Sequence, residues 1–253
     1  MPVEFFADAI IAIDNGSRRL FVDVGSNLVY REMTPTATQS CQPLRELWES
    51  RVSSSQVLYW SPTGFIETLV SGTPVIRLND KNLATALNSA VKQLVSLQDL
   101  ASAETSEAHV ERGFEILKGA DQGHFRRLRQ LEAELAGSPL VPAGSDNSPR
   151  NALFDGEKVT FVDVCPVTTL PAFVRPLGLV AAWTAGRRTN LASRWNSVVR
   201  PELEGLFPTP VDNLDDALLH SLTHLAIACE GALDLPLADA HARYSWLIKA
   251  YRL

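Results

Sequence analysis

The chain has 253 residues, of which 45% are hydrophobic and 21% charged, and its formal net charge is -6. These proportions are typical of a folded globular protein, and no run of about 18 apolar residues could span a membrane. The acidic balance gives no positive field that would attract a nucleic-acid partner. The N-terminal residues lack the basic region of a secretory signal, so we expect a cytoplasmic protein.

The first quarter of the chain predicts a small antiparallel sheet. An Asn-Gly turn at residues 14–17 separates two apolar runs, which indicates a hairpin because Asn and Gly tolerate positive φ. A third strand over residues 27–33 is followed by an irregular stretch and a short helix over residues 43–50. Residues 55–60 and 64–70 then form another antiparallel pair around a Ser-Pro-Thr-Gly turn.

Beyond residue 74 the pattern changes to that of helices. Asn79 is a predicted N-cap, and the apolar residues that follow it recur at helical spacing. Further helices are expected over residues 106–118, 125–137, 177–185, 191–204, 212–229 and 237–251. The three cysteines, Cys41, Cys165 and Cys229, are far apart and odd in number, which favours free thiols over a disulfide framework or a cysteine zinc site.

Residues 144–164 interrupt the helical region with a predicted β-hairpin. Antiparallel neighbours lie about 5 Å apart, so Asn151, before the first strand, and Asp163, near the end of the second, are expected to face one spot. An amide and a carboxylate, completed by phosphate oxygens and water, suit Mg²⁺. Asp146, five residues before Asn151, is positioned to orient a hydroxyl and receive its proton, which completes the set that phosphoryl transfer requires.

Each polar residue of this hairpin also has a simpler explanation. Asp146 and Asn151, taken singly, are ordinary turn residues. Asp163 is different, because a carboxylate that closes an apolar strand needs a partner or a metal. The three residues together favour a functional site.

The spacing from Asp146 to Asn151, followed by Asp163, resembles the catalytic loop and metal-binding Asp of the protein-kinase-like fold. It is most similar to the aminoglycoside phosphotransferase and choline kinase-like family, which has a His-Gly-Asp-x-x-x-x-Asn pattern. This resemblance implies an α+β fold of two lobes: a reduced antiparallel β lobe with the hinge over residues 1–69, and a mainly helical lobe over 70–253. It implies that Asp146 is the catalytic base and that Asn151 and Asp163 are the metal ligands.

The resemblance also implies an ATP site between the lobes. The segment from Gly64 to Val75 resembles the hinge strand of that family, so the backbone of Glu67, Thr68 and Leu69 is expected to bind the adenine. Glu32 resembles the glutamate, on a helix of the N-terminal lobe, that pairs with the ATP-phosphate lysine.

Three features depart from the family pattern. Gly144 stands where the family has His, whose role is largely to brace the loop. Asp23 stands where the ATP-phosphate lysine is expected, and a carboxylate there would repel phosphate. No glycine-rich loop of the G-x-G-x-x-G kind is present; the candidates for an electrostatic substitute are Arg18, Arg19 and Arg31.

The function predicted from these residues is an ATP- and Mg²⁺-dependent transfer of phosphate to a small-molecule hydroxyl. The alternatives are a catalytically impaired, pseudokinase-like binding or regulatory module, and an unrelated protein with a chance motif. His220 and His224, four residues apart on a predicted helix, have a spacing that suits a metal. The leucines around them favour packing or surface histidines instead.

Overall fold

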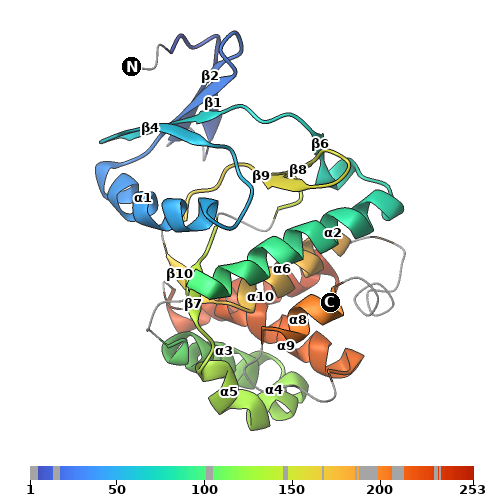
Figure 1. Ribbon diagram of the computed structural model, residues 1–253. Helices are drawn as coiled ribbons and strands as arrows, with labels where there is room; N and C mark the ends of the chain where they lie inside the picture. Colours follow the sequence, from blue (N-terminus) through green and yellow to red (C-terminus); the bar gives the residue numbers. More distant parts are fainter. Residues whose placement is uncertain are drawn as a thin grey trace.

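The computed structural model describes residues 5–13, 18–100, 105–144, 148–166, 168–185, 187, 199–206, 214–230, 233 and 235–253. Figure 1 shows a sheet and one helix at one end of the molecule and a bundle of helices at the other, with a small hairpin between them. The predicted α+β class with two lobes is therefore confirmed. Within the described residues, no helix has the length and apolar character needed to cross a membrane.

The sheet of the N-terminal lobe has five antiparallel strands in the order β1-β2-β3-β5-β4. The predicted pairs form: Ile13 is opposite Arg18 across the first turn, and Ser61 is opposite Gly64 across the last. The strands are β1 (Ala9–Ile13), β2 (Arg18–Asp23), β3 (Leu28–Glu32), β4 (Val57–Ser61) and β5 (Gly64–Thr68).

Helix α1 (Pro35–Glu49) is longer than the sequence pattern predicted. The stretch expected to be irregular is its first half, so that prediction was wrong. The helix begins where Thr34 accepts a hydrogen bond from the backbone N–H of Ala37 at 3.2 Å, with Pro35 in the first helical position. Threonines and a serine lower the helix propensity of this half, which is followed by an internal Pro43, and burial of one face against the sheet and the hairpin compensates for it.

The predicted hairpin forms between the lobes. Strands β8 (Ala152–Phe154) and β9 (Val159–Phe161) pair with each other, and β8 also pairs with β6 (Thr73–Pro74), just after the sheet. Gly72, at φ +154°, allows this connection to pass over β8, because a Cβ there would lie 3.0 Å from Cβ of Leu153. On the other side, the N–H of Phe161 donates to the carbonyl of Ser53 at 2.8 Å, which joins the hairpin to the segment after α1.

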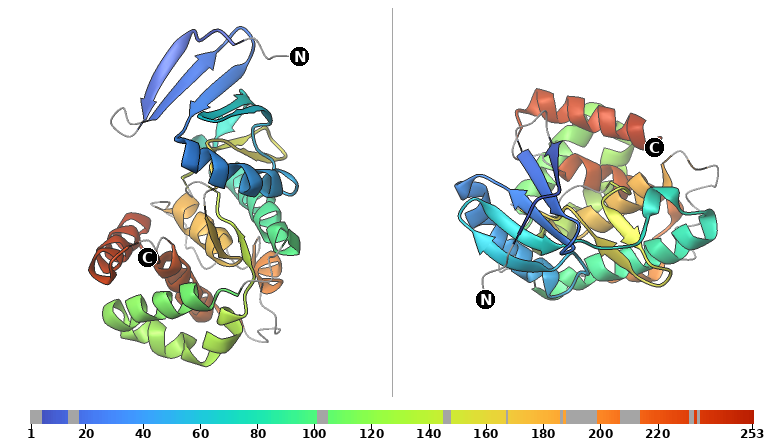
Figure 2. Two further views of the ribbon diagram at one scale, coloured as in Figure 1. Left: turned by 90° about the vertical axis from the view of Figure 1, so that its left-hand side faces the viewer. Right: turned by 90° about the horizontal axis from the view of Figure 1, so that it is seen from above.

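The C-terminal lobe contains helices packed around α6 and α9, both of which are apolar on most of their surface. Figure 2 shows these helices gathered on the side of the hairpin opposite the five-stranded sheet. The helix predicted over residues 125–137 is divided into two α-helices with a short 3-10 turn between them, and residues 191–198 of another prediction lie outside the described residues. The elements are α2 (Asp80–Val95), α3 (Glu107–Ala120), α4 (Gln122–Leu128), α5 (Glu132–Ala136), β7 (Leu140–Pro142), β10 (Thr169–Pro171), α6 (Val174–Thr184), α8 (Arg200–Glu204), α9 (Asp216–Cys229) and α10 (Leu237–Tyr251).

Candidate active site

The hairpin brings Asn151 and Asp163 to neighbouring positions at its open end. The N–H of Val162 donates to the carbonyl of Asn151 at 2.9 Å, so the backbone pairing continues one step beyond the strands. Asp163 then leaves the strand with φ +58°, a left-handed conformation that Asp tolerates better than most residues. Its side chain is 39% exposed, so it can still meet a ligand.

Arg31, on β3, connects Asp163 to the sheet. One nitrogen of its guanidinium donates to the carboxylate of Asp163, and another donates to Glu67 on β5 at 3.0 Å. Burial alone would lower the pKa of Arg31, but the charges of Glu67, Cys165 and Asp163 outweigh it and raise that pKa. A permanently charged, fork-shaped donor therefore lies beside the predicted metal ligand, with the geometry that suits phosphate oxygens.

A second buried arginine, Arg45 on α1, completes the ion pairs around Glu67. Its side chain has no exposed surface, and it donates to Glu67 at 3.3 Å, to the hydroxyl and carbonyl of Ser55, and to the carbonyl of Val164. Ser55 also donates to Glu67 at 2.6 Å. Arg45 therefore joins helix α1 to strand β5 and to the segment after β9, and the buried charge of Glu67 is matched by two cations.

The predicted catalytic base, Asp146, lies outside the described residues, but the chain that leads to it is described. Gly144 is packed against Trp48 of α1: a Cβ at position 144 would lie 2.6 Å from the indole ring. Arg175 on α6 donates to the carbonyls of Ala143 and Gly144 at 3.3 and 3.1 Å. Trp48 and Arg175 thus hold the backbone where the family pattern would place a histidine.

Asp23, which the resemblance aligned with the ATP-phosphate lysine, is the last residue of β2, whereas β3, which carries Arg31, is the strand that precedes α1. Which of these strands contacts phosphate stays a prediction. Asp23 is turned to a loop, where hydrogen bonds from the backbone N–H groups of Ser26 and Phe6, at 2.9 and 3.1 Å, lower its pKa. Its charge is therefore satisfied by the backbone.

Glu32, which resembles a glutamate that lies on a helix in the family, is the last residue of β3, within the predicted strand, and pairs with Arg19 of β2 at 2.8 Å, on a partly exposed surface. It is therefore not left without a partner. A contact between Glu32 and a nucleotide stays a prediction.

The predicted adenine-binding backbone lies at the end of β5. The N–H groups of Thr68 and Leu69 already donate to the carbonyls of Gln56 and Asn27, at 2.9 and 2.8 Å. Val70 and Ser71 come next, and within the described chain their N–H groups donate to no other backbone group. If adenine is bound by this segment, the donor therefore comes from just after the predicted residues.

Two of the three thiols lie close to this site. Cys41 of α1 is fully buried and interacts with Cys165, two residues after Asp163. The hydrogen bond from Cys41 and the charge of Arg31 lower the pKa of Cys165. All three cysteines are free, as the sequence predicted.

Comparison with solved structures assigns the fold. The chain is similar to an aminoglycoside phosphotransferase from Streptomyces rimosus, solved with ADP and streptomycin (TM-score 0.56, 14% identity, 85% of this chain and 91% of that one). It is also similar to a macrolide 2'-phosphotransferase from Brachybacterium faecium (0.55, 12%, 92% and 87%) and to a choline kinase from Cryptosporidium parvum (0.51, 13%, 96% and 89%). No protein-family model and no curated protein sequence matches the chain. The resemblance found in the sequence is confirmed at the level of the fold, which is the two-lobed, protein-kinase-like fold of small-molecule phosphotransferases.

The sequence reasoning missed Arg45, Trp48 and Arg175. Arg45 and Trp48 could have been found, because Thr38, Cys41, Arg45 and Trp48 follow one another at spacings of three or four residues and form the buried face of α1. Arg175 gives no such signal, since α6 is buried on all sides and its pattern has no period.

Proposed function

We propose that this protein transfers the γ-phosphate of ATP to a hydroxyl group of a small molecule, in a Mg²⁺-dependent reaction between the two lobes. The observation that carries the proposal is the contact of Arg31 with Asp163, beside Asn151, at the point where the sheet meets the hairpin. A cation that suits phosphate and two oxygen ligands that suit Mg²⁺ are thereby placed together. The named activities of proteins with the same fold are phosphotransferase and kinase activities, one of them seen with ADP.

In the proposed reaction, Asp146 orients the acceptor hydroxyl and accepts its proton. The acceptor oxygen forms a bond to the γ-phosphorus as the bond from that phosphorus to the β-γ bridging oxygen breaks, and ADP leaves. Arg31 stabilises the negative charge of the phosphates. Mg²⁺, held by Asn151 and Asp163, would neutralise the charge on the β- and γ-phosphate oxygens.

The donor set fits the metal. Asp163 is partly exposed and bears a hard carboxylate oxygen, while Asn151 offers an amide oxygen from the adjacent strand end. Two protein ligands are enough, because Mg²⁺ usually keeps several waters and takes the rest from phosphate. We place the adenine against the end of β5 at Leu69, with Val70 and Ser71 as the next backbone donors.

A second candidate is a binding or regulatory module that holds a nucleotide without turning it over. The observation that favours it is the same ion pair, because Asp163 already neutralises part of the positive charge of Arg31 that would otherwise act on the phosphates. Both candidates bind a nucleotide, but only the enzyme consumes it.

The test combines nucleotide-dependent thermal stability with turnover. ATP or ADP with Mg²⁺ should raise the unfolding midpoint, because a ligand that binds only the folded state stabilises it. Acceptors to be tried are aminoglycosides, macrolides, choline and ethanolamine. Stabilisation with ATP consumption supports the enzyme, stabilisation without consumption supports the module, and no stabilisation rejects both.

The residue assignments are tested with substitutions in the same assay. Asp163→Ala should abolish turnover, and Asp146→Asn should lower it by about 100- to 10,000-fold, the contribution of a general base. Asp155→Asn is the matched control, because Asp155 lies at the other end of the hairpin and accepts hydrogen bonds within its turn. Turnover that survives Asp163→Ala would show that the metal assignment is wrong.

A further inference from the structure

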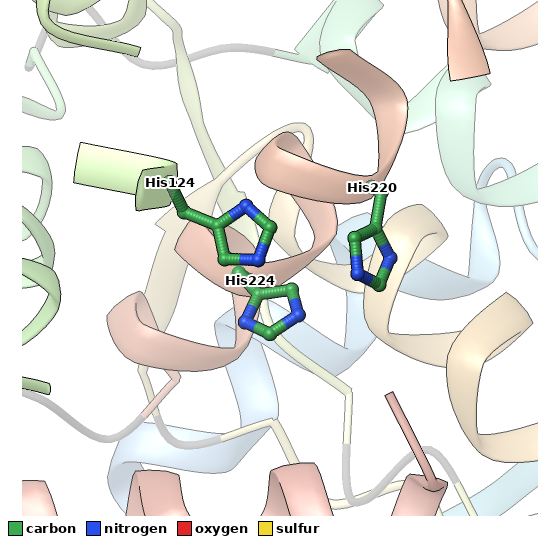
Figure 3. Close-up of side chains that lie close together, drawn as sticks. All are labelled: His124, His220 and His224. Carbon is green, nitrogen blue, oxygen red and sulfur yellow. The ribbon is translucent and has the colours of Figure 1, made fainter. Parts of the chain in front are cut away.

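Three histidines meet in the C-terminal lobe, far along the chain from the residues of the proposed phosphate site. His124 belongs to α4, and His220 and His224 occupy successive turns of α9 (Figure 3). One ligand nitrogen from each lies within 4.8 Å of the others, and the rings of His124 and His224 are 3.9 Å apart between centroids. The sequence showed only the pair on α9; the third member comes from about 100 residues earlier, so its approach is a product of the fold.

The most buried member has an unsatisfied ring nitrogen. His224 is 4% exposed, its Nδ1 lies 2.7 Å from the hydroxyl of Tyr244, and its Nε2 has no hydrogen-bond partner. Burying such a polar atom without a partner is unfavourable and uncommon in native proteins. The centroid of its ring lies 3.9 Å from that of His124 and 4.7 Å from that of His220, and both of these imidazoles have nitrogens that can bind a metal.

The tautomer of His124 leaves its other nitrogen available to a metal. Its Nδ1 lies 2.9 Å from the hydroxyl of Ser221, and that hydroxyl donates to the carbonyl of Ala217 and accepts from Arg127. Ser221 must therefore accept from His124, which places the proton on Nδ1 and a lone pair on Nε2. Metal-binding histidines in proteins are commonly fixed in this way, with the second ring nitrogen held by a hydrogen bond.

Burial, with a smaller contribution from nearby positive charge, keeps the imidazoles neutral. Burial lowers the pKa of His124, His220 and His224, that of His224 to about 3, and the charge of Arg127 lowers the first two further. Asp121 opposes this effect; its carboxylate lies 3.7 Å from Nε2 of His124. Neutral imidazoles are the form that binds metals, and Asp121 supplies a negative charge that offsets Arg127.

We propose that His124, His220 and His224 bind one divalent transition-metal ion of the zinc type, with water or Asp121 in the remaining position. Zinc–nitrogen distances of about 2.0–2.1 Å place tetrahedral nitrogens about 3.3 Å apart, so the cluster contracts on binding. His220 is exposed, and its side chain can turn to close the gap and provide the entry path. The ion joins α4 to α9 and satisfies the buried nitrogen of His224.

The test measures Zn²⁺ binding to the full chain after treatment with EDTA, by competition with a chromophoric chelator. One equivalent of Zn²⁺ should bind. Replacing the exposed ligand, His220→Ala, should weaken binding by at least about 100-fold, and Tyr244→Phe, which removes the hydroxyl behind His224, by about 10- to 100-fold. The control His109→Gln replaces a histidine outside the cluster and should leave the affinity unchanged.

Cobalt distinguishes this site from the other possible ones. Co²⁺ bound by the three imidazoles should give visible bands without thiolate charge transfer, and excess Mg²⁺ should not displace it. Thiolate bands would place the metal at Cys41 and Cys165, and displacement by Mg²⁺ would place it at Asp163. Either of these cobalt results would overturn the proposal. It would also be overturned if no stoichiometric Zn²⁺ binding were found, or if His220→Ala left the affinity for Zn²⁺ unchanged. These outcomes do not depend on the phosphotransfer assays.

Discussion

At the scale of single residues, Gly144 is packed tightly against Trp48 of α1. The indole occupies the space that any side chain at position 144 would need. Gly144→Ala should therefore destabilise the protein by about 1–3 kcal/mol in urea unfolding, the range for overpacking. Gly137→Ala is the matched control, because its Cβ would meet no atom closer than 3.4 Å. In a Trp48→Leu background the cost should fall; an equal cost in both backgrounds would exclude the steric explanation.

Arg31 is the residue on which the proposed phosphate site depends most. Arg31→Met should lower kcat/KM for ATP by about 100- to 1,000-fold, the usual loss for one transition-state donor, and Arg31→Lys, which keeps the charge but loses the planar fork, should cause an intermediate loss. Arg200→Met is the control, since Arg200 forms an ion pair with Asp216 at 3.0 Å in the helical lobe, away from the proposed phosphate site. Equal losses in the Arg31→Met and Arg200→Met variants would show that Arg31 has only a structural role.

At the scale of elements, α1 depends on Arg45 for its attachment to the rest of the molecule. This side chain connects α1 to β5 and to the segment after β9, without exposed surface. Arg45→Met should cost about 3–5 kcal/mol of unfolding free energy, because Glu67 loses one of its two cations in a buried site. Arg51→Met, just after the helix and exposed, should change stability by less than about 0.5 kcal/mol. A small loss in both variants would mean that Arg31 alone suffices for Glu67.

The same helix shows where sequence reasoning was limited. The strands, the hairpin with its Asp-Gly turn and helices such as α2 followed from local patterns and were predicted with small errors at their ends. The first half of α1 was not, because its helix propensity is low and its burial depends on contacts with β5 and β9. Because of that error, β2 and not β3 was compared with the strand that carries the lysine in the family, and Arg31 was named only as one of three candidate substitutes. The histidine cluster was beyond local patterns, since α4 and α9 meet only in the folded chain.

At the scale of the whole molecule, the histidine cluster makes stability depend on pH. The pKa of His224 is about 3 in the folded state, below its ordinary value of about 6.5, because of burial and then because a proton on His124 or His220 would repel a proton on His224. The unfolded chain therefore binds the proton first, and stability should fall as pH drops from about 7 toward 3, by at most about 1.4 kcal/mol per pH unit for this group. Tyr244, Asp121 and Arg127 also face the cluster.

The measurement is urea unfolding at pH 7 and pH 5 in the presence of EDTA, which excludes metal binding. The His224→Gln variant should lose less stability between these pH values than the unsubstituted protein, even if it is less stable at both. In the control variant His109→Gln, the loss of stability between pH 7 and pH 5 should equal that of the unsubstituted protein. A slope that His224→Gln does not change would assign the acid sensitivity to other groups.

If the protein binds a nucleotide as proposed, the ion pair between Arg31 and Asp163 has a consequence for which form of the nucleotide it accepts. The carboxylate of Asp163 is paired with the guanidinium of Arg31, which a phosphate would otherwise contact. The carboxylate therefore competes with phosphate for Arg31. A nucleotide that arrives with its own divalent cation can draw the carboxylate away and take its place in one exchange. A nucleotide without a divalent cation brings no new partner for the carboxylate of Asp163 when the ion pair breaks. The protein should therefore bind the metal-free nucleotide more weakly than the metal complex.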